Sequence, residues 1–192
     1  MRELSLHILD IAENSISAGA TQIEITVIED LLQDELWITV QDNGRGMDAE
    51  MVKRVIDPFV TSRTTRKVGL GIPLLKDAAE ACNGFFTIDS EIGKGTTIRT
   101  KFQHSHIDRM PLGDLAETFL TLLIGTPEVH WIFTYKVNDQ AFLVDDQEIK
   151  EVLNGISLTD SRVIEYLNHL FREGIAETKE SAVTQGAQYA NH

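Results

Sequence analysis

The stretch DNGRGM, residues 42–47, marks the point at which a half-buried strand ends. Before it, Leu36, Ile38 and Val40 alternate with less apolar residues, as on a strand that buries one face. The glycines and Asx residues of the stretch predict a turn, and Asp48 is suited to cap a short helix after it. A strand, a tight turn and a helix therefore follow one another here.

The same turn is a candidate binding site. A carboxylate at the end of a strand, here Asp42, can accept a hydrogen bond from an adenine amino group. Gly44 and Gly46 would let the backbone approach the base with no side chain in the way. Taken alone, an ordinary turn after a strand explains these residues equally well.

Outward from this turn, apolar periodicity predicts the order α-ββ-α-loop-α-ββ as far as residue 102. Helices on one face of a mixed or antiparallel sheet make a two-layer α/β sandwich. The expected helices are 3–17, 48–55 and 72–81, and the expected strands are 23–27, 36–40, 85–88 and 96–102.

After residue 105 the pattern changes, and we predict a separate small α+β unit over residues 106–175. Residues 176–192 are polar and lack a core-forming pattern, so we expect a mobile tail. Within the unit we expect a helix over 112–124, a hairpin of strands 129–137 and 141–144, and helices 147–153 and 160–172.

Composition excludes several classes of function. The net charge of −13 disfavours nucleic acids and anionic membranes as partners. No apolar run approaches the roughly 20 residues of a membrane span, and the first residues do not resemble a signal peptide. The single cysteine, Cys82, cannot form an internal disulfide, so we expect a reducing, cytoplasmic location.

The end of the first helix carries oxygen ligands. Asp10 and Asn14 are four residues apart and share a helix face. A carboxylate and an amide carbonyl are both suited to Mg²⁺ and its waters. By themselves, the two residues are explained more simply as a solvated helix face.

Two glycine motifs complete the set of candidate segments. Gly69, Leu70 and Gly71 open a helix, where free amides and the positive helix end can bind phosphate. The stretch GKGTT, residues 93–97, is by itself more typical of a simple hairpin.

In this order and spacing, the four segments resemble the gyrase, heat-shock chaperone, histidine kinase and mismatch-repair (GHKL) ATPase superfamily. The motifs GLGI at 69–72, NG at 83–84 and SEIGKGTT at 90–97 are similar to those of histidine kinase catalytic domains. The stretch DIAENSISAGAT at 10–21 is closer to the mismatch-repair ATPases. The resemblance covers residues 3–102 and implies a Bergerat-type ATP-binding domain within residues 1–105.

The resemblance also implies the role of each site residue, with ATP and Mg²⁺ as cofactors. The magnesium ligand would be Asn14, and Asp42 would accept from the adenine amine beside Gly44 and Gly46. Residues 60–68 look like the lid that closes over ATP. The phosphates would be bound by the backbone amides of Gly69, Leu70 and Gly71 and by the lid cations Arg63, Arg66 and Lys67. The Thr97 hydroxyl would lie near the adenine.

Two departures from the family pattern bear on turnover. Lys67 stands where histidine kinases usually have a glycine, and the lid is short. ATP-hydrolysing relatives place a glutamate four residues before the asparagine to activate water, and Asp10 is one methylene shorter. A carboxylate at that point can act as a general base if it comes within hydrogen-bond reach of the water.

The sequence shows no phosphoacceptor hairpin next to the ATP-binding segment, so we expect a phosphoacceptor to lie in another protein. The stretch HIDRMP at 106–111 partly matches a phosphoacceptor box, but Ile107 stands where an acid is usual, so we interpret His106 as a linker residue. Three functions fit these features: a stand-alone kinase acting on a separate protein, an ATPase, or a non-catalytic ATP-gated interaction module.

The partner we expect is a protein substrate or regulator, with a homodimer as a further alternative. The whole chain, including HSHIDR at 104–109, also resembles small ATP-binding proteins linked to bacterial iron-only hydrogenase gene clusters. That resemblance implies a redox enzyme or its regulator as the partner.

Overall fold

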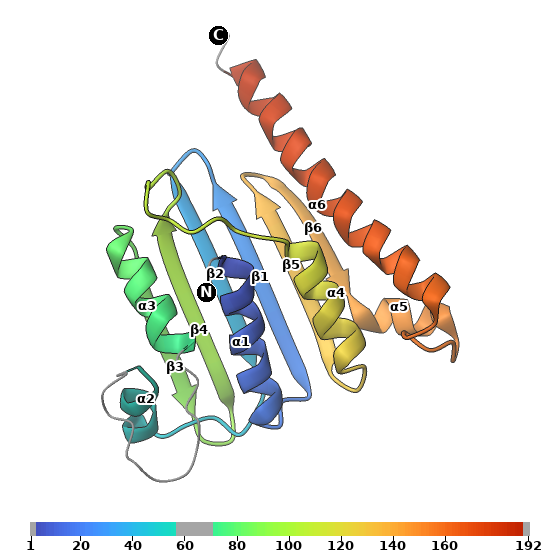
Figure 1. Cartoon of the computed structure of the whole chain (residues 1–192), viewed down its shortest axis with the longest axis horizontal. Helices are drawn as coiled ribbons and strands as arrows, with labels where there is room; N and C mark the ends of the chain where they lie inside the picture. The colour runs from blue at the N-terminus through green and yellow to red at the C-terminus, as the bar shows by residue number, and fades with distance from the viewer. Residues whose placement is uncertain (1–2, 57–70, 190–192) are drawn as a thin grey trace.

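A computed structural model describes residues 3–56 and 71–189 of the 192 residues. Its centre is one six-stranded sheet in the order β3-β4-β2-β1-β5-β6 (Figure 1). The helices are α1 (Leu4–Ser17), α2 (Ala49–Ile56), α3 (Gly71–Ala81), α4 (Leu115–Gly125), α5 (Asp146–Leu153) and α6 (Ser161–Tyr189). The strands are β1 (Gln22–Asp30), β2 (Glu35–Asp42), β3 (Phe85–Glu91), β4 (Gly95–Gln103), β5 (His130–Val137) and β6 (Gln140–Asp145).

The sheet is mixed, and helices α1, α3 and α4 lie over one of its faces (Figure 1). Every strand pairing is antiparallel except that of β1 with β5, which is parallel. The alternating residues Ile23, Ile25 and Val27 of β1 are fully buried beneath the helices. This confirms the two-layer α/β sandwich, and each expected element up to residue 102 lies within a few residues of its predicted bounds.

Residues 106–175 do not form a unit with a sheet of its own. Strand β5 pairs with β1 from Gln22–His130 to Glu29–Val137, and β6 then pairs with β5. The buried side chains of these strands belong to the same core as those of β1 and β2. The predicted domain boundary at 105/106 is therefore wrong. Strand β1 pairs with β2 along one edge and with β5 along the other, so both segments belong to one sheet.

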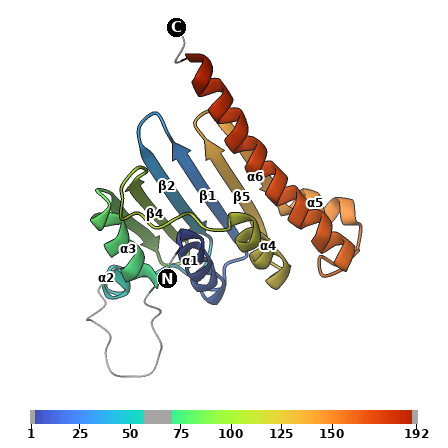
Figure 2. The same ribbon diagram turned by 45° about the horizontal axis from the view of Figure 1, so that its top comes forward.

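The predicted mobile tail is also corrected. Helix α6 continues to Tyr189; Figure 1 shows it beside β6, and Figure 2 shows it projecting beyond the end of the sheet. Leu167 and Phe171 are fully buried, and Thr178 and Ala182 continue the same face at helical spacing. Thr178 and Ala182, on the buried face of this part of α6, are small or polar. The sequence here therefore lacks the apolar periodicity that would have predicted a helix.

The turn and cap chemistry explains the remaining boundaries. Helix α4 begins after Asp114, whose carboxylate accepts from Glu117 N at 2.9 Å, rather than at the predicted residue 112. The β5–β6 hairpin turns at Asn138, which adopts a positive φ of 50° as asparagine does more readily than most residues. Although α6 has 29 residues, no helix in the described ranges combines the length and apolar character needed to cross a membrane.

Glu29, at the end of β1 away from residue 42, contacts side chains from β5, from the segment after β4 and from α6. Its carboxylate accepts a hydrogen bond from the Tyr135 hydroxyl and lies 2.7 Å from His104 Nε2 and 4.0 Å from Lys179 Nζ. Burial raises the pKa of Glu29, but the hydrogen bonds from Tyr135 and His104 outweigh it, and the net pKa is lowered. The ionised form of Glu29 therefore stabilises the fold.

We predict that Glu29→Gln lowers the stability of the protein at neutral pH by on the order of 1–3 kcal/mol, because hydrogen bonds to a buried charge are lost. A lowered carboxyl pKa gives stability that is complete above the unfolded value, 4.5, and is lost as pH falls through the folded value. Urea unfolding of both proteins between pH 3 and 8 should therefore show their curves converging below pH 4.5. A difference that is constant with pH would contradict this role for Glu29.

Candidate nucleotide site

Asp42, the last residue of β2, has a buried carboxylate with two donors. Ser15 Oγ, from α1, donates to Asp42 Oδ2 at 2.7 Å, and Gly44 N donates to Asp42 Oδ1 at 2.8 Å. The side chain is 8% exposed. An ionised carboxylate has about four acceptor positions, so two of them are left for a ligand. This geometry fits a group that accepts a hydrogen bond from a base.

The backbone around Asp42 is too close-packed for side chains. A Cβ on Gly44 would lie 3.0 Å from Asp42 Oδ1, and one on Gly46, where φ is +65°, would lie 1.9 Å from Glu91 O. On the neighbouring strand, a Cβ on Gly95 would lie 1.9 Å from Asp42 O. Gly44 and Gly46 therefore belong to the same wall as Asp42, and the close contact at Gly95 was not anticipated.

Two further hydrogen bonds hold the turn after β2 in place. Gly93 N donates to Arg45 O at 2.8 Å, and Ser90 Oγ accepts from Met47 N at 2.8 Å. Thus the GKGTT hairpin, which alone is typical of an ordinary turn, packs directly against the turn that follows Asp42.

Asp10 and Asn14 lie one helical turn apart on α1, beside the start of α3. A Cβ on Gly71, the first residue of α3, would lie 2.5 Å from Asp10 Oδ2. A side chain at position 71 would therefore displace the Asp10 carboxylate from the start of α3. Asn14 is exposed, so its amide is accessible to a hydrated ion. The Asp10 carboxylate thereby lies at the positive end of α3, with Asn14 one turn further along α1.

His7 continues the same face of α1 by one turn. It is 2% exposed, and its Nδ1 has no hydrogen-bond partner. Burial lowers its pKa below the usual value, although a hydrogen bond to the backbone of Gly71 acts in the opposite direction. His7 is therefore a packed residue between α1 and α3.

The predicted lid, residues 60–68, lies in the part of the chain that the structure does not describe. Arg63, Arg66, Lys67, Gly69 and Leu70 lie outside the described residues, and their roles at the phosphates stay predictions. Of the predicted phosphate-binding glycines, the structure places Gly71 alone.

Thr97 is not brought together with Asp42. In the β2–β4 register, Thr97 is opposite Gln41, whereas Thr96 is opposite Asp42. Residues directly opposite in a sheet share a face, and successive residues alternate. Thr96 therefore lies on the face of Asp42 and Thr97 on the other face. Thr96 also lies 2.9 Å from Ser90, between the two hydroxyl oxygens.

His106 is at the opposite end of the sheet. It follows β4 close to Asp34, which precedes β2, while Asp42 ends β2. Eight strand residues separate these ends, which is about 24 Å at the rise of an antiparallel strand. His106 therefore lies at the end of the sheet away from Asp42 and takes no part in the turn that follows β2.

Sequence reasoning missed Ser15. The core stripe of α1 runs through Ile8, Ile11 and Ala12, and its next member is this buried serine. A hydroxyl on an apolar stripe signals a buried hydrogen bond, since an unpaired polar group there is costly. A serine on the apolar face of α1 thus predicts a buried hydrogen bond, but the sequence does not show that Asp42 is the partner.

Comparison with known proteins identifies the fold family. Residues 2–106 match the histidine kinase-, DNA gyrase B-, and HSP90-like ATPase family. The chain belongs to this family. The match covers more than half of the chain, including α1, the Asp42 turn and both strands of the GKGTT hairpin.

Curated relatives include the sensor histidine kinase YxdK and sporulation kinase D of Bacillus subtilis. They are 33% and 32% identical to this chain over 91 residues each, which is 45% and 47% of the chain. The matches span only 27% and 18% of those two proteins. The shared part is therefore one domain of longer kinases.

Solved structures agree on the fold. The ATPase domain of Aquifex aeolicus MutL, complexed with ADP, has a TM-score of 0.50 at 15% identity, covering 80% of this chain and 70% of that one. The N-terminal domain of a DNA repair protein has a TM-score of 0.53 at 16% identity, covering 75% and 52%. Membership of the ATPase family implies ATP binding. The link to hydrogenase gene clusters stays a prediction.

We predict that Ser15→Ala weakens binding of ADP about tenfold, because Asp42 loses one of the two donors that orient its carboxylate. Isothermal titration calorimetry with ADP measures the change. Ser17→Ala is the matched control, since Ser17 is an exposed serine two residues further along the same chain. Equal affinities for ADP in the wild type and both variants would show that Ser15 does not orient the site.

Proposed function

We propose that this protein binds Mg-ATP and transfers the γ-phosphate to a separate protein or to water. The observation that carries the proposal is the position of Asp10, whose carboxylate lies against Gly71 at the start of α3, one turn from Asn14. The family places nucleotide phosphates at this helix end. A base and a magnesium ligand would then stand beside the phosphate that is transferred.

Each part of the nucleotide would have its own residues. Asp42 would accept from the adenine amino group, and the free N-terminal amides of α3 would bind phosphate. Asn14 would hold Mg²⁺ through its amide oxygen and through water, which suits an ion that keeps part of its hydration shell. The lid cations Arg63, Arg66 and Lys67 would neutralise the γ-phosphate.

The register of β4 refines one assignment. Because Thr96 shares the face of Asp42, its hydroxyl is better placed than that of Thr97 to contact the adenine side. We therefore propose Thr96 for that role.

Asp10 would act as the general base. In hydrolysis, a water oxygen forms the new bond to the γ-phosphorus, the bond to the β-phosphate oxygen breaks, and the water proton passes to Asp10. In transfer to a protein, the acceptor side chain replaces the water. Positioning and charge neutralisation do most of the work in such reactions. The shorter side chain of aspartate favours a proton path through an intervening water.

The acceptor would be a protein substrate or regulator, and a second copy of the chain is the alternative partner. This proposal also includes a cytoplasmic location, where ATP is available. The shorter base at position 10 favours one further function, an ATP-gated interaction module that binds nucleotide without turnover.

The test follows ATP labelled at the γ-phosphate in the presence of Mg²⁺, recording free phosphate and labelled protein over time. We predict turnover in the wild type and a fall of at least about a hundredfold in Asp10→Asn with ADP affinity retained, since general bases contribute about 10²–10⁴-fold. Glu13→Gln is the matched control, because Glu13 is an exposed acid on another face of α1. Asp42→Ala should abolish both binding and turnover.

The outcomes separate the three functions. Phosphate release that requires Asp10 identifies an ATPase, whereas labelled protein without release identifies a kinase. ADP binding with no turnover, and none after addition of candidate protein acceptors, would contradict the catalytic proposal and favour the nucleotide-gated module.

A further inference from the structure

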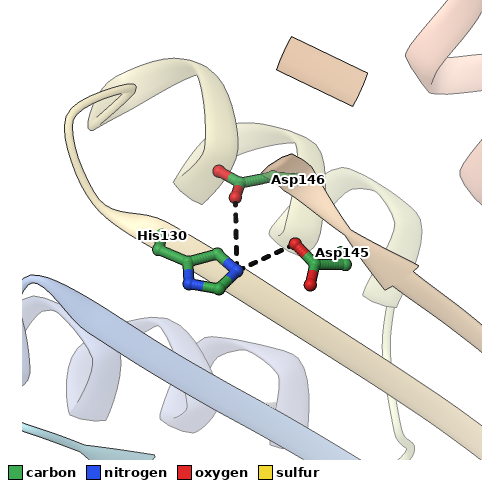
Figure 3. Close-up of side chains that lie close together, drawn as sticks. All are labelled: His130, Asp145 and Asp146. Atoms are coloured by element: carbon green, nitrogen blue, oxygen red, sulfur yellow. Dashed lines mark hydrogen bonds and ion pairs between the residues drawn. The ribbon is translucent and has the colours of Figure 1, made fainter. Parts of the chain in front are cut away.

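A second group of side chains converges at the β5–β6–α5 junction. His130 begins β5, Asp145 ends β6, and Asp146 begins α5 (Figure 3). In the ranges that the structure describes, this is the one group of three His, Cys, Asp or Glu residues whose ligand atoms all lie within 4.8 Å of one another. None of the three takes part in the nucleotide site.

The ring of His130 points at both carboxylates (Figure 3). Its Nε2 lies 2.8 Å from Asp145 Oδ1 and 4.0 Å from Asp146 Oδ1. Asp145 Oδ1 also caps α5 by accepting from Gln147 N at 2.9 Å, so its carboxylate is held in place by the helix. Three potential ligands from three elements are therefore already oriented toward a common point.

Asp146 is the observation that calls for an explanation. It is 0% exposed, and neither of its carboxylate oxygens receives a hydrogen bond. Lys150 Nζ lies 2.6 Å from Oδ2 as an ion pair, which compensates that oxygen, and Lys150 also donates to Val129 O at 2.9 Å. Oδ1 has no hydrogen-bond donor and lies 4.0 Å from His130 Nε2. A buried carboxylate oxygen without a donor is costly.

We propose that His130, Asp145 and Asp146 bind a divalent transition-metal ion of the zinc type. Two ligand atoms at about 2.05 Å from a tetrahedral ion lie about 3.3 Å apart. The spacings of 2.8 and 4.0 Å at His130 Nε2 lie on either side of this value, and all three ligand atoms lie within 4.8 Å of one another, so movements on the order of 1 Å would form the site. The ion would give Asp146 Oδ1 the partner that it lacks.

The ligand chemistry selects among the divalent ions. An imidazole nitrogen with two carboxylates suits Zn²⁺ and its first-row neighbours, whereas Mg²⁺ and Ca²⁺ prefer oxygen alone. Three protein ligands leave a fourth position for water. The alternative explanation is a purely structural network in which His130 and Lys150 neutralise the two aspartates, and it needs no ion.

The site lies at the same end of the sheet as Asp42, two strands away. His130 N donates to Thr21 O at 2.8 Å, and Thr21 N donates to Asn43 Oδ1 at 2.8 Å. Asn43 directly follows Asp42. An ion at His130 would therefore hold in place the strand ends next to the turn that follows Asp42. The ion would bind independently of the nucleotide site, because the two sites share no residue.

The test uses the full chain, freed of metal with a chelator, and titrates Zn²⁺ against a zinc-binding dye without nucleotide. Co²⁺ replaces Zn²⁺ for visible absorption, which reports the coordination geometry. The test variants are His130→Gln and Asp146→Asn. The matched control is His104→Gln, because His104 also lies 2.7 Å from a carboxylate, that of Glu29, and belongs to no group of converging ligands in the described ranges.

We expect one equivalent of Zn²⁺ bound at micromolar or lower concentration, with a rise in melting temperature and no competition from millimolar Mg²⁺. His130→Gln and Asp146→Asn should weaken binding at least about tenfold, and His104→Gln should not. Near-ultraviolet circular dichroism checks that each variant is folded. If Asp146→Asn fails to fold, the other two variants still decide the result.

Two results would overturn the proposal. The first is the absence of stoichiometric Zn²⁺ binding by the wild type, which would leave the cluster as an ion-pair network. The second is binding that is equally strong in folded His130→Gln, which would place the ion elsewhere in this acidic chain.

Discussion

The hydrogen bond between Ser15 and Asp42 joins the two layers of the molecule at the point where the candidate nucleotide site begins. Ser15 is on the buried face of α1, and Asp42 ends a strand near the middle of the sheet. Charge-assisted hydrogen bonds are stronger than neutral ones, and this one is buried. It sets how far α1 reaches along β2, and with it the positions of Asp10 and Asn14.

Close packing around that bond leaves little freedom to the backbone. Gly44 and Gly95 bring the turn and the neighbouring strand into contact with Asp42; a Cβ at Gly95 would collide with the backbone of Asp42, and one at Gly44 would be tightly packed. Gly71 does the same for α3 against Asp10. Close approach thus accounts for the glycines of three separate segments, and each approach moves a polar group toward the same region.

Much of this arrangement could be predicted from the sequence. The alternation in β1 and β2 and the glycine motifs identify the elements and the family up to residue 102. The continuation of the sheet could not be predicted, because alternation shows that one face of β1 is buried without showing that both of its edges are paired. The end of α6 was missed because Thr178 and Ala182 are small or polar members of its buried stripe.

The candidate site shows the same limit. Asp42, Gly44 and Gly46 could be found from their spacing, since they are close in sequence. Ser15 and Thr96 depend on helix phase and strand register, which a motif does not specify. The cluster of His130, Asp145 and Asp146 forms only once β5 and β6 are paired, and no spacing in the sequence indicates it.

Both regions lie at one end of the sheet, and a short path of hydrogen bonds through Thr21 and Asn43 joins them. The opposite end is held by Glu29 with Tyr135 and His104. The candidate nucleotide site and the proposed ion site thus both lie where β2 ends and β1 and β5 begin.

If the nucleotide binds as proposed, the Asp42 carboxylate recognises the amino group of adenine. Calorimetric titration of the wild type and of Asp42→Asn with ADP and with inosine diphosphate tests it most directly, because inosine replaces the amino donor by a carbonyl acceptor. We predict that the wild type prefers ADP by at least about tenfold and that Asp42→Asn loses this preference. Equal binding of the two nucleotides by the wild type would contradict the account.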